Sequence, residues 1–383
     1  MNRTLEWARQ ATAYNSSGGL LAEHWRTRAI SLQFAALAQY PWKPSLTSRE
    51  FYTDFCKSDF GLDDEADAAT CAALWDDGML DPTCKRLYTP ACVNPPRPPM
   101  NGLPAAIKAD SSSWASQEGK YSFVDAMFSA LDTKITGAEN RERWMYWVSQ
   151  LRSLQADAKL ATQWGAMDTM LSRVQGESDP AKRRELVLQQ ALPLREQMVQ
   201  QAELAMLWKM NTTSTTGGLG AVANFQQMVL TNSLAVRSCS KNGASNNGCK
   251  EYTKILLGNS GMAQLPAAAM PVDSFRGVER CFVLSPRGSI EKGEALTVRV
   301  IALLREANVG KATATIHYRP MGATAQAFKM LPMARERGSV WSATLGLDVL
   351  QSDLEYFVGV GGANSSLVWP AGAPATPHTV IVV

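Results

Sequence analysis

Apolar residues change their spacing once along this 383-residue chain, and the change limits the folds that the chain can adopt. From Glu139 to about residue 235 they recur every three or four positions, which predicts helices that each bury one face. After about Gly277 they alternate with polar residues, as in Leu296, Val298 and Val300, which predicts strands. About seven such runs, separated by Gly and Pro turns, are typical of an antiparallel β-sandwich of the immunoglobulin or fibronectin III type. We therefore expect an α+β protein with several domains.

Local signals predict where several helices begin. Thr47 stands three residues before Glu50, which is the spacing of a capping box. Asp179 directly precedes Pro180, as an N-cap residue precedes a proline in the first turn. Pro193 is expected to kink its helix, because its ring clashes with the carbonyl four residues earlier. The helix after Thr47 is expected to turn three aromatic residues inward, Phe51, Phe55 and Phe60.

The segment from Gly18 to Trp42 carries the clearest candidate site. A short apolar run, Gly18 to Ala22, leads into Glu23, His24, Trp25 and Arg26. A helical pattern follows, whose expected buried face consists of Ile30, Phe34, Leu37 and Ala38. A strand that ends in polar and aromatic residues and leads into a helix is the arrangement at the active-site rim of a (β/α) barrel.

The four residues Glu23 to Arg26 are suited to binding a sugar. Trp25 offers a flat apolar face to the C–H side of a sugar ring, while His24, Arg26 and Glu23 supply hydrogen bonds and charge. The alternative is an ordinary strand-to-helix turn, with Trp25 packed in a core and the arginines solvated. Both interpretations are compatible with the pattern.

A complete barrel does not fit this chain. Eight βα units need about 250 residues, whereas few residues precede Gly18 and no strand–helix alternation follows residue 45. We therefore expect residues 1–45 to be the last unit of a barrel. Residues 46–276 are expected to form a helical domain with a Cys-rich and Pro-rich insertion at 56–104, and residues 277–383 the sandwich.

The cysteines favour an oxidising compartment. Cys239 and Cys249 bracket a polar loop and are predicted to be bridged. Four more cysteines, Cys56, Cys71, Cys84 and Cys92, allow three pairings, and Cys281 is left over. Glycosylation sequons begin at Asn2, Asn15, Asn211 and Asn364. Together these features predict a secreted or lumenal protein; the alternative is a cytosolic protein with reduced thiols.

Composition excludes several classes of function. The net charge of +3 is small and the basic residues are interspersed with acidic ones, so we expect no nucleic-acid partner. No run approaches the roughly 18 apolar residues of a membrane-spanning helix. The three histidines, His24, His317 and His378, make neither a metal cluster nor a Ser–His–Asp set, and we expect no metal or other cofactor.

Several motifs resemble the tail of multidomain glycoside hydrolases of the α-glucuronidase and hexosaminidase type. They are the HWRTR sequence from His24, the helix ending Tyr40-Pro41-Trp42, and the EFYTDF sequence from Glu50. Blocks similar to the helical domain begin at Glu139, Ala191 and Gly220, and blocks similar to the terminal sandwich begin at Tyr318, Leu354 and Pro377. The resemblance implies a catalytic barrel, then a helical domain, then a sandwich, and it carries over no catalytic residue.

These observations predict the C-terminal portion of a secreted, carbohydrate-active enzyme, similar to a glycoside hydrolase and inactive alone. Hydrolysis of a glycosidic bond needs two carboxylates about 5 to 9 Å apart. Only Glu23 stands where a barrel rim is expected, so the second carboxylate belongs to a strand outside this chain. The alternative is a binding or scaffold protein that recognises a glycan or a protein partner without catalysis.

Overall fold

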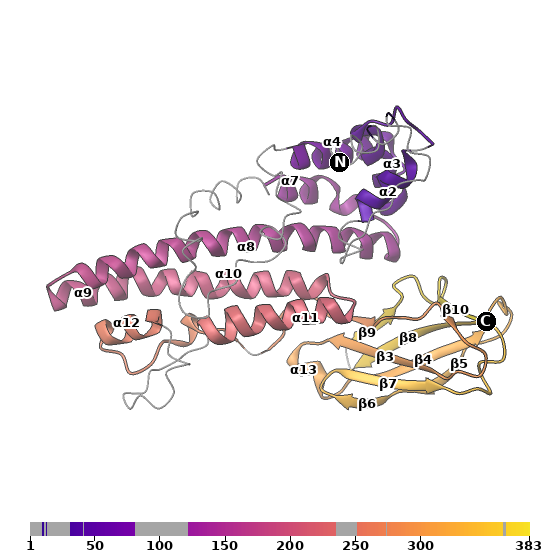
Figure 1. The fold of residues 1–383 in the computed structure, drawn as a ribbon. Helices are drawn as coiled ribbons and strands as arrows, with labels where there is room; N and C mark the ends of the chain where they lie inside the picture. Colours follow the sequence, from indigo (N-terminus) through magenta and orange to yellow (C-terminus); the bar gives the residue numbers. More distant parts are fainter. Residues whose placement is uncertain are drawn as a thin grey trace. The chain divides into compact units, whose positions relative to one another are not determined.

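The computed structural model describes residues 10, 13, 31–40, 42–80, 122–234, 251–272, 274–362 and 365–383. The chain forms two compact units. The first comprises residues 1–96 and 105–162, and the second comprises residues 97–104 and 163–383. Figure 1 shows helices along the first part of the chain and strands after about residue 280.

Helices make up the described part of the chain before residue 280, and strands dominate after it. The helices are α2 (Ser31–Gln39), α3 (Ser48–Phe60), α4 (Glu65–Leu80), α7 (Ser122–Leu131), η2 (Asp132–Lys134), α8 (Ala138–Gly176), α9 (Pro180–Leu186), η3 (Val187–Ala191), α10 (Leu192–Asn211), α11 (Thr216–Phe225), η4 (Gln226–Leu234), α12 (Glu251–Ser260), η5 (Ala267–Ala269) and α13 (Glu306–Val309). The strands are β1 (Arg280–Val283), β2 (Ser289–Ile290), β3 (Leu296–Leu303), β4 (Thr313–Pro320), β5 (Lys329–Pro332), β6 (Ala334–Arg337), β7 (Val340–Leu345), β8 (Leu354–Gly362), β9 (Ser365–Trp369) and β10 (His378–Val382). The mixed α+β composition is as predicted.

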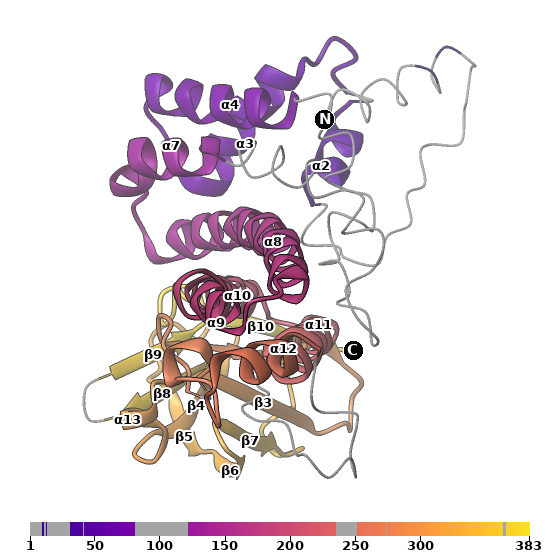
Figure 2. The same ribbon diagram turned by 90° about the vertical axis from the view of Figure 1, so that its left-hand side faces the viewer.

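An aromatic core holds the first unit together. Side chains of α2, α3, α4, α7 and the first part of α8 share one buried cluster, and Figure 2 shows α3, α4 and α7 side by side. Phe51 and Phe60 are buried, and Phe55 packs against them half-buried, so all three predicted aromatic residues point inward. The Trp75 ring meets the Trp147 ring edge-on at 5.4 Å, a favourable geometry for aromatic pairs.

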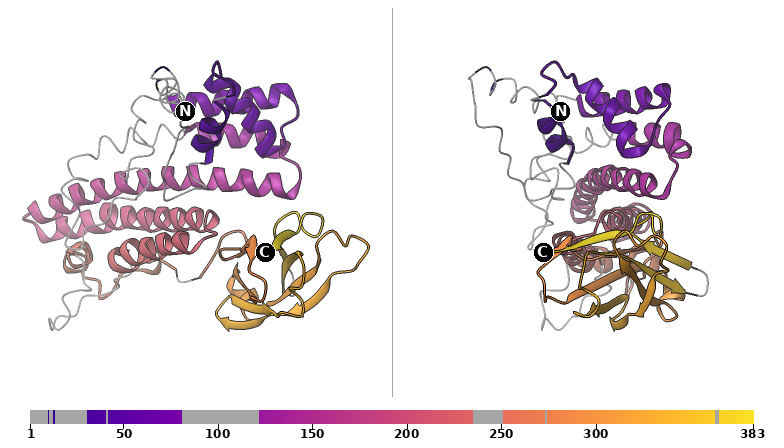
Figure 3. Two further views of the ribbon diagram at one scale, coloured as in Figure 1. Left: turned by 45° about the vertical axis from the view of Figure 1, so that its right-hand side comes forward. Right: turned by 90° about the vertical axis from the view of Figure 1, so that its right-hand side faces the viewer.

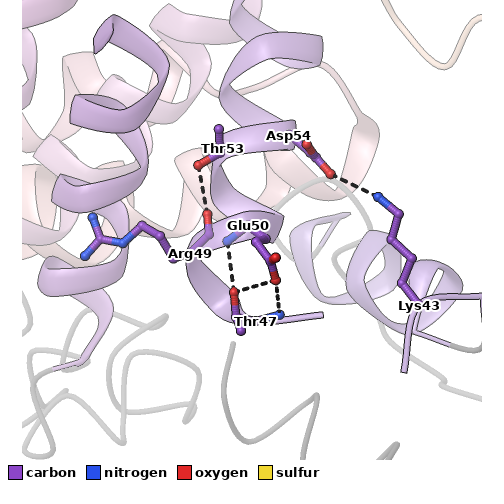
Figure 4. Close-up of polar contacts among 6 residues, drawn as sticks. All are labelled: Lys43, Thr47, Arg49, Glu50, Thr53 and Asp54. Atoms are coloured by element: carbon purple, nitrogen blue, oxygen red, sulfur yellow. Dashed lines mark hydrogen bonds and ion pairs between the residues drawn. The ribbon is translucent and has the colours of Figure 1, made fainter. Parts of the chain in front are cut away.

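The predicted capping box at the start of α3 is confirmed. The Glu50 backbone N–H donates to Thr47 Oγ1 at 3.2 Å, and the Thr47 backbone N–H donates to Glu50 Oε2 at 2.9 Å (Figure 4). These two bonds satisfy amide groups that a helix start leaves without partners. The bonds from Thr47 lower the pKa of the Glu50 carboxyl below its usual value.

A disulfide joins α3 to α4. It links Cys56 and Cys71, whose Cα atoms lie 6.3 Å apart, within the usual range for a disulfide. Both cysteines are fully buried in the aromatic core. This bond belongs to one of the three pairings that the sequence left open, and Cys84 and Cys92, which would form its other bond, lie outside the described residues.

The buried face of α2 differs from the prediction. Leu32, Ala36 and Tyr40 are buried, whereas Phe34 is half-buried and Ala38 is exposed. Of the other two predicted positions, Leu37 is half-buried against the core and Ile30 lies outside the described residues. Most residues of α2 are apolar, so the spacing of its apolar residues does not indicate which face is buried.

Helix α9 in the second unit begins where the sequence predicts. Asp179 is the N-cap, and its carboxylate accepts a bond from the Ala181 N–H at 2.9 Å, with Pro180 in the first turn. Pro193 follows a π-helical turn, η3, where the Leu192 N–H donates to the Val187 carbonyl. The longer turn is how the chain accommodates a proline inside a continuing helix.

Two sheets share one hydrophobic core after residue 280. The four-stranded sheet has the order β1-β3-β7-β6; the other has the order β2-β10-β8-β4-β5, with β9 pairing with β8. Figure 3 shows these strands, coloured orange to yellow, in two further views. Trp341 of the first sheet and Tyr356 of the second are the largest side chains of their common core. The pairs are antiparallel as predicted, with β2 and β10 as a short parallel exception.

Candidate functional site

The predicted sugar-binding residues Glu23, His24, Trp25 and Arg26 lie outside the described residues. So do Cys239 and Cys249, the remaining cysteines Cys84 and Cys92, and the sequon residues Asn2, Asn15 and Asn364. The sugar site, the second disulfide and these glycosylation sites therefore stay predictions.

Asn211 is the one sequon residue with a described position. It is the last residue of α10, half-buried, and its side-chain oxygen is buried. The Arg280 guanidinium donates to the backbone carbonyl of Met210 at 3.2 Å and also to that of Asn211. Glycosylation of Asn211 stays a prediction. It requires the side-chain amide nitrogen to be accessible, because the glycan is attached to that atom.

A second apolar face of α2 lies opposite the buried one. At about 100° per residue, Phe34 and Ala38 each lie roughly 160° around the helix from the buried Ala36. Trp42, just after the helix, is 87% exposed. Phe34 therefore lies on an apolar face that the aromatic core of the first unit does not cover.

A cluster of aromatic and charged side chains lies on the outward face of the second sheet. It consists of His317 and Arg319 on β4, Glu355 and Phe357 on β8, and Phe328 just before β5, and we call it the Phe357 cluster. The His317 and Phe357 rings stack in parallel with centroids 4.4 Å apart. The Phe328 ring meets the Phe357 ring edge-on at 4.9 Å.

Arg319 fixes one end of this cluster. It forms a hydrogen-bonded ion pair with Glu355, and both side chains are nearly enclosed, at 14% and 11% exposure. The same guanidinium donates to the Gln326 carbonyl at 3.1 Å and lies 4.2 Å from the centre of the Phe328 ring. Arg319 therefore holds the β4–β5 turn against the sheet, and the two opposite charges neutralise each other.

His317 occupies the more open end of the cluster. Partial burial lowers the pKa of its imidazole below the ordinary value and so favours the neutral ring. On β5 the opposite residue is Met330, which is 66% exposed. A Cβ atom placed on Gly359 would lie 3.6 Å from His317 Nε2, so the position beside this nitrogen has no side chain.

The Phe357 cluster cannot act as a glycosidase site. It contains one carboxylate, Glu355, which is already paired with Arg319, whereas bond cleavage needs two carboxylates. Within the described ranges, no group of three or more His, Cys, Asp or Glu side chains is placed to hold a metal ion. The cluster offers an aromatic face and hydrogen-bonding groups to a ligand.

The sequence contained a signal for this cluster that periodicity alone did not reveal. In β8 the inward residues Tyr356 and Val358 alternate with Glu355 and Phe357, and an outward phenylalanine departs from the usual polar outer face. The pairing of Phe357 with His317 depends on the register of β4 and β8, which a single sequence does not specify.

Comparisons with known proteins give little further guidance. No protein-family model matches the chain, and no curated protein matches it. One solved structure with weak similarity is an endo-β-1,4-mannanase from Thermotoga petrophila, at 9% identity and a TM-score of 0.22. The alignment covers 72% of this chain and 63% of the mannanase chain, less than two thirds of the latter. A TM-score this low does not show a shared fold.

No helix in the described part of the chain is both long enough and apolar enough to cross a membrane.

Proposed function

We propose that this chain is the C-terminal portion of a secreted carbohydrate-active protein of the glycoside hydrolase type. In this proposal residues 1–45 complete a catalytic barrel, and Glu23, His24, Trp25 and Arg26 line its sugar site. The chain alone lacks most of the barrel and is inactive. The resemblance of its motifs to such enzymes supports the proposal.

One structural observation supports it most: α2 is apolar on two opposite faces. Leu32, Ala36 and Tyr40 pack into the helical core of the first unit, while Phe34 and Ala38 point away from that core. The last helix of a barrel needs two opposite apolar faces when a helical domain follows it. One of its faces packs on the barrel strands and the other contacts the next domain.

The disulfide adds support for secretion. Cys56 and Cys71 are bridged, and disulfides persist mainly in oxidising compartments. If Cys239 and Cys249 are bridged as well, a non-reducing peptide map will contain both linked peptides. Free thiols at both Cys239 and Cys249 would contradict the second bridge.

Sugar binding by the full-length protein, barrel included, tests the proposed site. Trp25→Ala is expected to weaken oligosaccharide binding by about 1–3 kcal/mol, the range for losing a stacked aromatic contact. Trp42→Ala is the matched control, because Trp42 is exposed and lies outside the predicted site, the corner formed by residues Glu23 to Arg26. Titration calorimetry of both variants measures the difference. Equal affinities for the two variants would overturn the assignment of Trp25 to the site.

The alternative function is a non-catalytic scaffold that binds glycans or proteins. The Phe357 cluster favours it, because this cluster has binding groups but no pair of carboxylates. Assaying the chain joined to an upstream barrel separates the two functions. Release of reducing sugar that depends on Glu23 supports the enzyme, whereas binding without hydrolysis supports the scaffold.

A further inference from the structure

The outward face of β4 and β8 continues beyond the Phe357 cluster to Thr315 and Gly359. His317 stands opposite Phe357, and Thr315 stands opposite Gly359. Residues two positions apart on a strand share a face, so these four residues lie on the same side of the sheet. The residues between them on each strand, Ile316 and Val358, are buried on the other side. Gly359 leaves the space next to His317 Nε2 without a side chain.

The chemistry of this face selects a neutral ligand. Arg319 and Glu355 neutralise each other, and the lowered pKa of His317 favours its uncharged ring. The half-buried Phe357 ring keeps part of its apolar surface in solvent. His317 Nε2 and the Thr315 hydroxyl supply polar groups beside it. A ligand that suits these groups has an apolar C–H side, several hydroxyls and no charge.

We infer that Thr315, His317, Phe357 and Gly359, which we call the Gly359 face, bind a neutral pyranose ring of an oligosaccharide. Hydroxyls of the ring bond to His317 Nε2 and to Thr315, and its C–H side packs against the part of the Phe357 ring that the stacked His317 ring and Phe328 leave uncovered. The inference takes its ligand class from the proposed function. It adds a second, non-catalytic sugar site that is separate in sequence from the Glu23–Arg26 corner. Sugars that carry a carboxylate gain no ion pair here, because Arg319 is already paired with Glu355.

The three histidines allow the two sugar sites to be tested separately in the full-length chain. His24 reports on the predicted corner, and His317 reports on the Gly359 face. His378 serves as a control, because its ring contacts Tyr356 and Trp369 in the core-facing layer. The chain is labelled with ¹³C at the histidine Cε1 positions. It is then titrated in separate NMR experiments with neutral hexasaccharides of glucose, mannose and xylose and with a hexasaccharide of glucuronic acid.

Each pattern of shifts gives a distinct answer. We expect at least one neutral hexasaccharide to shift the His317 signal in a saturable way and to leave His378 in place. A shift of His24 without His317 retains the proposed function and overturns the Gly359 face. A shift of His317 without His24 retains the Gly359 face and contradicts the proposed corner. No saturable shift of either, or a His317 shift with the uronic hexasaccharide alone, overturns the inference.

Two glycine substitutions make the test specific. Gly359→Ala places a methyl group beside His317 Nε2 at an ordinary contact distance, so the chain folds while the sugar position is occupied. We expect at least a tenfold loss of affinity measured at His317. Gly288→Ala is the control, since a Cβ there meets no atom within 4 Å and the residue lies away from this face. Unchanged affinity in Gly359→Ala, with an unchanged melting temperature, overturns the inference.

Discussion

At the scale of single residues, short-range chemistry determined much of the structure. Thr47 with Glu50, and Asp179 with Pro180, begin their helices where the sequence predicts, because a cap needs only residues within one turn of each other. Pro193 was harder to predict. A proline inside a helix requires a local change, but the sequence does not indicate whether that change is a kink or a π-helical turn.

The capping box gives a prediction at this scale. Thr47→Ala is expected to lower the free energy of unfolding by about 1 kcal/mol, the usual cost of losing an N-cap. Thr53→Ala is the matched control, because Thr53 lies inside the same helix and its hydroxyl donates to the Arg49 carbonyl rather than to a helix-capping group. Urea denaturation measures both variants. Equal effects of the two substitutions would mean that the cap does not stabilise α3.

The same motif predicts a pH dependence. The pKa of Glu50 is lowered in the folded state by its bonds to Thr47, so its stabilising contribution is present above the unfolded pKa. The contribution is lost as the pH falls through the folded pKa. The difference in stability between the wild type and Thr47→Ala should therefore shrink in acid. A difference that stays constant from pH 7 to pH 3 would exclude this linkage.

At the scale of elements, local patterns were less informative, because packing partners decide which face is buried. Both faces of α2 are apolar, and the choice of Leu32, Ala36 and Tyr40 depends on α3 and α4, which sequence spacing does not show. The strands were recognised by alternation, but the His317–Phe357 pair depends on register. The mixture of helices and antiparallel sheets was therefore predictable, whereas the composition of the Phe357 cluster was not.

The disulfide between α3 and α4 gives a prediction for this scale. Replacing Cys56 and Cys71 together by alanine removes a bridge across a separation of 15 residues. We expect the free energy of unfolding to fall by roughly 2–4 kcal/mol. The wild type unfolded in the presence of reductant should lose a similar amount, and the double variant should not respond to reductant. A reductant effect of equal size in both proteins would assign it to other cysteines.

Arg195 joins three helical segments of the second unit. Its buried guanidinium donates to the Leu234 carbonyl at 2.8 Å and to the Ala269 carbonyl at 3.1 Å, the ends of η4 and η5. Burial lowers its pKa to about 10, so it remains charged at neutral pH. Arg195→Met is expected to cost about 1–3 kcal/mol of stability by leaving buried carbonyls without donors. A variant as stable as the wild type in urea would show that water replaces these bonds.

At the scale of the whole molecule, the spacing of apolar residues changes near Gly277, and the first described strand, β1, begins at Arg280. The 277–383 segment has its own core, in which Trp341 and Tyr356 from the two sheets meet. We expect this segment to fold when expressed alone, with a cooperative melt and a β-type circular dichroism spectrum. A gradual, non-cooperative melt would show that it depends on the helices, to which Arg280 is hydrogen-bonded.

The central claim is that this chain belongs to a carbohydrate-binding protein, and calorimetric titration of the full-length protein, barrel included, with neutral oligosaccharides tests it most directly. The account predicts saturable binding that Trp25→Ala weakens about 5- to 150-fold, equivalent to roughly 1–3 kcal/mol, while Trp42→Ala leaves it unchanged. Absence of saturable heat with hexasaccharides of glucose, mannose, xylose and glucuronic acid would contradict the account.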